Sequence, residues 1–340
     1  MNNDERKIFW DNLCSLDADS SSKDISRFFD SIKYPRFICR YRPITMRSIE
    51  ALQTNKMFFS SAYYYDDPFD TYLHIDWKRI ESIINSIDLQ SPKAFEYFQK
   101  ACEQFNIRPS EEFKCLFESL THGDLLKVAI STLNEKIRPQ MQKYSYSICF
   151  SEDPLNETLW LKYASNHTGF CLVYDLADEP KYRCGKEEKC KICANNQRAS
   201  IYPVYYSSEK YDATNYAFSQ SVFSFIANDL NNEELAKRYI SDIPMSWEAE
   251  KVALIKHKCH EYDSEWRIIS HNRFAENTFI KWIPSKIIIG LKTEQTEETL
   301  IVRAAMTAGI EHIYKAYISP TDDFDAYELN KEQISQIISR

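Results

Sequence analysis

The sequence predicts an α+β protein built on one mixed or antiparallel sheet, with helices inserted between its strands. Segments of alternating apolar and polar residues are scattered between residues 36 and 317, and long stretches of helical periodicity separate them. The chain has only 5 Gly, and these stand far apart. This spacing excludes the P-loop, the dinucleotide fingerprint and the kinase glycine loop, because each needs several glycines in one short turn.

The amino-terminal part predicts two short helices over 1–32, separated by the serine run at 20–22. Residues 36–42 alternate as a strand, and residues 57–61 predict a second, short strand. In the first strand one face carries Phe37, Cys39 and Tyr41, and the other carries Arg36, Ile38, Arg40 and Arg42.

The predicted core domain extends over 33–317 and receives two insertions. One is a helical lobe at 76–140, and the other is a cysteine-rich hairpin at 176–200. The remaining elements are strands at 144–150, 169–175, 201–206, 265–270, 279–283, 285–291 and 312–317, helices at 213–257 (broken near Pro244) and 296–308, and a tail or helix at 318–340.

The composition describes a globular, non-membrane protein. It is 44% hydrophobic and 14% aromatic, and no stretch approaches the roughly 18 apolar residues of a membrane helix. Ten cysteines without a secretory signal indicate reduced thiols and a cytoplasmic location. The net charge of −8 argues against broad nucleic-acid binding, although it permits a local basic groove.

The late segment EYDSEWRI (261–268) concentrates charge on one strand face. Alternation sends Trp266 and Ile268 to the core and places Asp263, Glu265 and Arg267 opposite. These charges form either a salt-bridged, solvated surface or a cleft in which a guanidinium holds a carboxylate in place.

Two other segments offer binding groups. Arg40 and Arg42 form either a clamp for phosphate or carboxylate or an ordinary edge-strand surface. Ser60 offers a hydroxyl to a ribose or backbone, or it is a cap or turn serine. Trp160 and Tyr163 share a helical face that either stacks on a base or packs in the core.

The aspartates at 66, 67 and 70 support a different hypothesis. With Asp263 and Glu265 they could hold a divalent metal, as in a nuclease. The alternative is a structural turn with an Asx hydrogen bond and Phe69 inserted into the core.

Cys184, Cys190 and Cys193 have a C-x5-C-x2-C spacing that favours a structural zinc site. The eligible fourth ligands are His167, Cys171, His257, Cys259 and His260.

Six pieces of the chain carry a family resemblance. They are RYR (40–42), FFSSAYYYDDPFD (58–70), LWLKYASNHTGFCLVYD (159–175), VYY (204–206), EYDSEWRI (261–268) and SKIIIG (285–290). In this order and spacing the chain resembles a bacterial domain family of unknown function, numbered twenty-nine seventy-one. The departures are mild: Arg40 replaces the usual Lys, Asp66 an Asn, Asp70 a Glu and Leu159 a Met. The family name implies no activity.

The motif order also resembles ADP-ribosyltransferase folds, which bind NAD in a split-sheet cleft without a glycine fingerprint. The resemblance implies that Arg42 clamps ribose or phosphate, Ser60 orients the NAD, and Glu265, with Glu261 as the fallback, is the catalytic carboxylate. It also implies NAD contacts from nearby residues. These candidates are Arg40, Tyr41, Tyr163 and Arg267.

We therefore expect an NAD-dependent ADP-ribosyltransferase-like enzyme that modifies a cellular macromolecule, in a bacterial defence or toxin role. The nearly isosteric change Glu265→Gln is expected to abolish NAD turnover and leave folding intact. Two alternatives stay open: a metal-dependent nuclease, and a non-enzymatic sensing or partner-binding module whose cleft charges are salt bridges.

Overall fold

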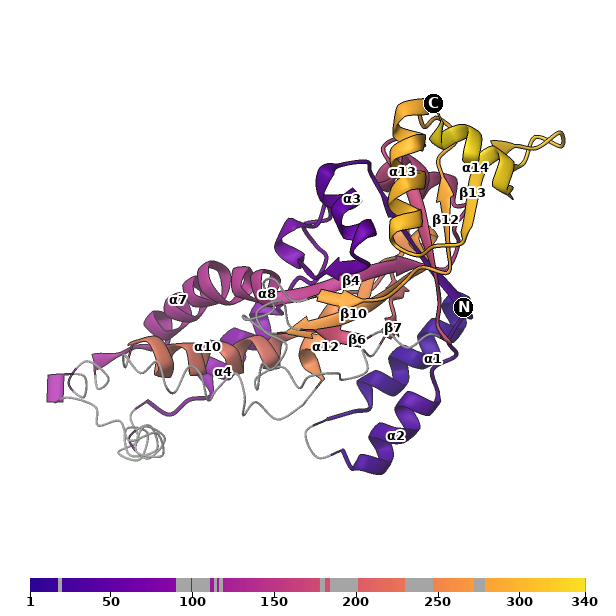
Figure 1. Cartoon of the computed structure of the whole chain (residues 1–340). Coiled ribbons are helices and arrows are strands. Elements are labelled where there is room, and N and C mark those ends of the chain that lie inside the picture. The colour runs from indigo at the N-terminus through magenta and orange to yellow at the C-terminus, as the bar shows by residue number, and fades with distance from the viewer. Residues whose placement is uncertain are drawn as a thin grey trace.

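The computed structural model describes residues 1–17, 20–89, 99, 111–112, 115, 119–177, 181–183, 201–229, 247–271 and 279–339. Figure 1 shows a central sheet with a helical arm extending to one side. Two helices, α13 and α14, lie at the opposite end, and α1 and α2 form a hairpin below the sheet. No described helix is long and apolar enough to cross a bilayer.

The described strands form a large sheet and two small ones. They are β1 (Phe37–Arg42), β2 (Lys56–Phe58), β3 (Ser60–Ser61), β4 (Ser145–Ser151), β5 (Phe170–Asp175), β6 (Lys181–Arg183), β7 (Ile201–Pro203), β8 (Tyr205–Ser207), β9 (Ile255–His257), β10 (Glu265–His271), β11 (Phe279–Lys281), β12 (Lys286–Ile289), β13 (His312–Ile318) and β14 (Phe324–Glu328).

The large sheet has the order β14-β13-β12-β5-β1-β4-β10-β7, and β3 pairs with β4 beside this path. Among the described strands of this sheet, only β12 and β13 pair in parallel, and α13 connects them as a crossover. The other pairs, β6-β11-β2 included, are antiparallel, apart from the small parallel pair β8-β9. The structure thus confirms an α+β protein with a mostly antiparallel open sheet.

The sheet is interrupted between β1 and β4. Strand β1 pairs with β5 along its whole length but meets β4 only where Cys39 faces Ser151. At the other end of β4, Ser60 of β3 pairs with Ser147. The edge of β4 toward β1 is therefore closed at its two ends and open between them, and we call this opening the split.

Each sheet face is covered by its own apolar cluster. The larger cluster joins Ile38, Phe150 and Trp266 to residues of α1, α2, α3 and α13. The smaller cluster joins Cys39 and Tyr41 to Leu159 and Trp160 of α9, which makes Trp160 a core residue. Directly opposed residues on paired strands share a face, so these clusters identify which face each side chain occupies.

Several of the described helices begin at a side-chain N-cap, among them α1, α2 and α3. The described helices are α1 (Asn3–Cys14), α2 (Ser22–Asp30), α3 (Met46–Gln53), α4 (Trp77–Asn85), α7 (His122–Thr132), α8 (Arg138–Tyr144), α9 (Glu157–Tyr163), α10 (Thr214–Asp229), α12 (Glu248–Ala253), α13 (Gln295–Thr307) and α14 (Lys331–Ile338), with 3-10 turns η1 (Ala62–Tyr64) and η3 (Lys258–Asp263) and a π-helical stretch η2 (Leu133–Ile137). Ser21, from the serine run, caps α2 with a capping box.

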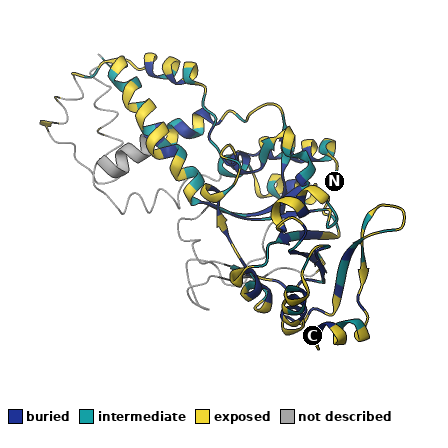
Figure 2. Cartoon of the chain, turned by 90° about the horizontal axis from the view of Figure 1, so that it is seen from above, coloured by how far each residue is buried: buried dark blue, intermediate teal, exposed yellow. Residues whose placement is uncertain are grey.

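The helical arm has its own small core. Helices α4, α7, η2 and α8 come from the predicted insertion, and α10 joins them from much later in the chain. Leu73, Ile80, Leu133 and Ala217 are buried together there. Figure 2 shows that the outer side of the arm is mostly exposed, whereas the buried residues concentrate in the sheet.

Several predicted elements differ from the structure. The predicted strand 57–61 is two strands, β2 and β3, in different sheets, and 201–206 divides into β7 and β8. The predicted helical stretch 213–257 ends in β9, which exists because β8 supplies a distant parallel partner. The Pro244 break lies outside the described residues.

The ends of two other predictions also change. The charged segment 261–268 is not one strand: η3 covers its first part, and Ser264 has a left-handed φ of 42° before β10 begins at Glu265. The tail at 318–340 contains β14 as well as α14. β14 is a short, largely exposed edge strand, so its sequence carries little apolar signal.

Two glycines allow close backbone approaches near the end of β1. The amide of Gly290 donates to the carbonyl oxygen of Gly169 at 2.9 Å. A Cβ at Gly169 would lie 2.2 Å from the Arg42 carbonyl oxygen, and one at Gly290 would lie 2.2 Å from the His167 carbonyl oxygen. Backbone contacts this close leave no space for a side chain.

We predict that Gly169→Ala lowers the free energy of unfolding by about 1–3 kcal/mol, because the new methyl group forces the end of β1 away from β5. Urea denaturation followed by circular dichroism measures the change. Gly123→Ala is the matched control: its Cβ would meet nothing closer than 3.7 Å, and alanine favours a helix by about 0.5–1 kcal/mol. Equal urea midpoints for Gly169→Ala and wild type would contradict the close approach.

Candidate functional site

The buried guanidinium of Arg267 is the centre of a charged network on the β10 face opposite Trp266. Arg267 is 1% exposed. Its terminal nitrogens donate to the two carboxylate oxygens of Asp70 at 2.6 and 2.7 Å, and its Nε donates to Glu265 at 2.6 Å. A further donation, to the Ala253 carbonyl oxygen, is 2.8 Å long. These contacts make Arg267 an anchor for two carboxylates rather than a free ligand group.

Lys256 of β9 is the second cation of this network. Its ammonium group lies 2.9 Å from Glu265, 3.0 Å from Asp263 and 3.7 Å from Asp70. Burial disfavours ionisation of Glu265, but the charges of Arg267 and Lys256 outweigh burial and hold the pKa of Glu265 well below its usual value. Glu265 is therefore ionised at neutral pH.

The backbone at Glu265 is held from both sides. The Tyr206 hydroxyl accepts a hydrogen bond from the Glu265 amide at 2.7 Å, and Arg6 of α1 donates to the Glu265 carbonyl oxygen at 2.7 Å. Arg6 is itself buried and contacts Glu152 at 2.6 Å. Helix α1 thus fixes the start of β10.

The turn that carries Asp70 has the Asx geometry predicted from sequence. The Asp67 side chain accepts from the Phe69 amide at 2.9 Å. Phe69, however, is 62% exposed, so its predicted insertion into the core is wrong. Thr71 has a φ of 53°, a strained conformation for a β-branched residue. The turn contains a strained backbone at Thr71, and it directs the Asp70 side chain inward to Arg267.

An acidic cavity of about 680 Å³ opens over this network. Its carboxylates are Asp66, Asp67, Asp70, Asp263 and Glu265. Its lining also includes cations, which are Arg40, Arg42, Lys162, Lys256 and Arg267. His260 contacts Asp67 at 3.2 Å. Tyr163, which is 40% exposed, contributes to the wall.

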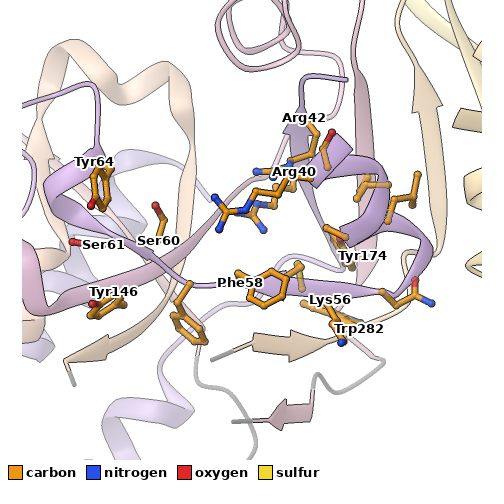
Figure 3. A pocket seen from close by; sticks show the side chains of 18 of the residues that line it. Arg40, Arg42, Lys56, Phe58, Ser60, Ser61, Tyr64, Tyr146, Tyr174 and Trp282 are labelled. Carbon is orange, nitrogen blue, oxygen red and sulfur yellow. The ribbon is translucent and has the colours of Figure 1, made fainter. Parts of the chain in front are cut away.

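A second cavity, of about 870 Å³, is cationic. Arg40, Arg42, Arg47, Lys56 and Lys143 line it, and its described lining residues include no carboxylate. Aromatic rings separate these cations, among them Phe58, Tyr64, Tyr174 and Trp282. Figure 3 shows Arg40 and Arg42 reaching into the cavity, with Ser60 and Tyr64 facing them from the other side.

Arg40 and Arg42 are partly buried, yet within the described part of the chain neither guanidinium has an ion pair or hydrogen bond. The adjacent charge of Arg40, together with burial, lowers the pKa of Arg42 to about 9. The Arg42 guanidinium therefore stays charged at neutral pH. Two neighbouring cations that form no ion pair with a carboxylate attract an anionic ligand.

The two cavities meet at the split. They share Arg40, Arg42, Ser60 and Tyr64 as lining residues. The strand register places Arg40 and Arg42 on the sheet face that carries Trp266, whereas the Glu265 side chain projects from the opposite face. The interruption of the sheet is therefore what allows residues from opposite faces to line connected cavities.

The predicted catalytic residues Arg42, Ser60 and Glu265 all line the acidic cavity. The hydroxyl that caps η1 belongs to Ser61, so Ser60 is not the capping serine. Glu265 is not on a solvated surface, since it is 6% exposed. Because Glu265 is a buried ion-pair partner, we now expect Glu265→Gln to lower stability as well as any activity.

The predicted NAD-contacting residues divide into two groups. Arg40 and Tyr163 are available on the cavity walls. Tyr41 and Arg267 already have structural partners: the Tyr41 hydroxyl donates to the Asp153 carbonyl oxygen at 2.5 Å and accepts from the Asn156 amide. Their contacts with NAD stay predictions, and in the structure both side chains already form hydrogen bonds within the protein.

The acidic segments predicted for a metal site do come together, but within the described residues no group of three His, Cys, Asp or Glu side chains is placed to hold a metal ion. Lys256 and Arg267 already form ion pairs with carboxylates of these segments. The zinc prediction is different, because Cys184, Cys190 and Cys193 lie outside the described residues. Of its proposed fourth ligands, Cys171 is buried in the sheet, and His167 is buried beside Trp160.

Sequence reasoning missed Lys256 and Arg6, because nothing in their local sequence distinguishes them from surface cations. It also missed which carboxylate has an oxygen without a hydrogen-bond partner among the described residues. Asp263 is 5% exposed, and its Oδ1 has no hydrogen-bond partner among the described residues. The only available signal was the face that Asp263 was predicted to share with Glu265.

The model of a family described as "Protein of unknown function (DUF2971)" matches residues 159–268. This match confirms the family resemblance predicted from the motifs. The matched stretch contains Tyr163, Lys256, Asp263, Glu265 and Arg267, whereas Arg40, Arg42 and Ser60 precede it. Searches of curated proteins and of solved structures found no match.

We predict that Arg267→Met destabilises the protein by about 3–5 kcal/mol, because it leaves buried carboxylates without their cation. A double-mutant cycle with Asp70→Asn, measured by urea denaturation, should show a combined loss smaller than the sum of the single losses. Arg79→Met is the control. Its pair with Asp212 is nearly half exposed, so the expected change is below about 1 kcal/mol. Additive losses at Asp70 and Arg267 would refute the coupling.

Proposed function

We propose that this chain, which matches a family of unknown function over residues 159–268, is an enzyme that binds NAD across the split and transfers its ADP-ribose group. The observation that carries the proposal is the pairing of a cationic cavity with an acidic cavity around Arg40, Arg42, Ser60 and Tyr64.

The charge distribution of NAD supports this assignment. Its pyrophosphate is anionic, while its oxidised nicotinamide ring carries a positive charge. Arg40 and Arg42, which have no ion pair among the described residues, offer donors to the pyrophosphate, and the acidic cavity offers carboxylates to the nicotinamide end. The scarcity of glycine also agrees with a dinucleotide site that uses no glycine-rich loop.

The reaction breaks the bond between the ribose C1′ and the nicotinamide N1. The bonding electron pair leaves with nicotinamide, which becomes neutral, and positive charge develops on the ribose. An acceptor hydroxyl or amine then forms a bond to C1′ and releases one proton to solvent. Carboxylates held close to the ribose stabilise the positively charged transition state.

In this proposal Glu265 and Asp263 have different roles. Glu265 is occupied by Arg267 and Lys256, so in our proposal it maintains the shape and charge of the cavity. Asp263 also contacts Lys256, but its Oδ1 has no hydrogen-bond partner among the described residues, which makes it the stronger candidate to accept from a ribose hydroxyl. Ser60 is exposed beside Arg40 and Arg42 and can orient the nucleotide.

We predict that NAD raises the melting temperature and binds at least about 10-fold more tightly than NADH, whose nicotinamide ring is uncharged; this difference corresponds to about 1.4 kcal/mol. Isothermal titration calorimetry measures both affinities. Arg42→Ala should weaken NAD binding by about 10- to 100-fold, since a hydrogen bond to a charged group contributes about 1.5–3 kcal/mol.

Arg36→Ala is the matched control on the same segment. Arg36 is mostly exposed, pairs with Asp175 and lines neither cavity. Equal weakening by both arginine changes would contradict the proposed phosphate site, and equal affinity for NAD and NADH would contradict the role of the acidic cavity. Stabilisation by magnesium or manganese in place of NAD would favour the nuclease.

We predict that Asp263→Asn lowers nicotinamide release by about 100- to 1,000-fold, the usual effect of removing one transition-state contact. Chromatography of the reaction quantifies nicotinamide. Glu265→Gln serves as the comparison: it should lower the urea midpoint more than Asp263→Asn does, because it removes a carboxylate paired with two buried cations.

Full nicotinamide release by folded Asp263→Asn would reject the role of Asp263. NAD binding by the wild-type protein without any nicotinamide release, with nucleic acids and proteins offered as acceptors, would instead favour the non-enzymatic sensor.

A further inference from the structure

We infer that the outer wall of the cationic cavity docks single-stranded nucleic acid, which is the acceptor in the transfer reaction. The acceptor role rests on the proposed function, whereas the docking surface does not. The surface is defined by Phe58, Tyr63 and Tyr64 together with Arg47 and Lys143, all of which line that cavity.

The aromatic residues of this surface are unusually open to solvent. Tyr64 is 77% exposed, Tyr63 is 62% exposed and Phe58 is 38% exposed. The rings of Tyr63 and Tyr64 lie edge to face with their centroids 5.4 Å apart. Clustered exposed rings are platforms on which unpaired bases stack, at about 1–3 kcal/mol per base.

The charges of the surface suit a phosphate backbone. Arg47 and Lys143 are exposed, Lys56 lies deeper, and the described lining of the cavity has no acid to repel phosphates. The whole chain carries a net charge of −8, so this basic surface contrasts with the rest of the molecule. Attraction confined to one surface favours a local site over coating of the protein by nucleic acid.

The available space accommodates both substrates. Ligand pockets usually measure about 300–1,000 Å³, and here cavities of about 870 and 680 Å³ meet at the split. NAD bound between Arg40, Arg42 and the acidic cavity leaves the outer part of the cationic cavity free. Tyr64 lines both cavities, so a base stacked on it lies next to the bound nucleotide.

A single strand fits this surface better than a duplex does. Rings between cations require bases that are not already stacked and paired, and a duplex offers only phosphates to such a surface. We therefore expect binding that depends on both the rings and the charges. Binding to phosphates alone would depend on the charges only.

Fluorescence anisotropy with a labelled twelve-nucleotide single strand, and with the same sequence as a duplex, tests the docking surface on the full chain. We expect Tyr64→Ala to weaken single-strand binding by about 5- to 100-fold. Arg47→Ala should reduce the slope of log affinity against log salt by about 0.7, the value for one phosphate contact of a single strand. The controls, which should leave binding unchanged, are Tyr327→Ala on β14 and Arg36→Ala, both outside the cavity.

Equal or tighter binding of the duplex, or loss of binding with Tyr327→Ala equal to that with Tyr64→Ala, would overturn the docking surface. The acceptor role is tested separately, by incubating NAD with the single strand and measuring the mass of the oligonucleotide. An added ADP-ribose group supports it. Release of nicotinamide with the oligonucleotide unchanged and a protein modified instead would overturn the acceptor role and leave the proposed function standing. Binding to the strand that Tyr64→Ala weakens, without any nicotinamide release, supports the docking surface and refutes the proposed function.

Discussion

The buried ion pair between Arg267 and Asp70 is the interaction on which the rest of the site depends. Arg267 lies on β10 and Asp70 lies in a turn nearly two hundred residues earlier, so their contact connects the early turn to the late strand. Glu265 and Lys256 complete the network, and they bring β9 to the same place. Burial makes each of these charges dependent on the others, because none can return to water when a partner is lost. The acidic cavity is the open side of this network.

The split between β1 and β4 has an equally direct consequence. In an uninterrupted sheet, residues of opposite faces never share a cavity. Here β4 is bonded toward β1 at Ser151 and toward β3 at Ser147, with an opening between these positions. Arg40 and Arg42 therefore contribute to cavities on both faces. The result is that a cavity whose described lining has cations and no carboxylate adjoins a cavity that also contains carboxylates, which suits a ligand that carries both signs.

Local patterns predicted what depends on neighbours in sequence. Alternation correctly assigned Trp266 and Ile268 to the core, and the aspartate turn was correctly predicted at Asp67. Local patterns failed where the pairing with a distant strand determines the secondary structure. Strand β9 forms because β8 pairs with it, and segment 57–61 divides because its two halves pair with different strands. Local patterns failed again at Ser264, whose left-handed backbone delays the start of β10. For the site, the residue types at Arg42, Ser60 and Glu265 were visible in the sequence, but not which carboxylate has a free oxygen.

The sequence by itself determined the α+β class, most of the long elements and the charged character of the segments that line the site, because alternation, helical spacing and capping depend on nearby residues alone. Only the tertiary structure decided that Arg267 is an anchor for Asp70, that Lys256 joins them, and that neither Arg40 nor Arg42 forms an ion pair among the described residues. The physical reason is that an ion pair requires contact within a few ångströms, and the contacts of residues far apart in sequence follow from strand register and sheet order, which no local pattern encodes.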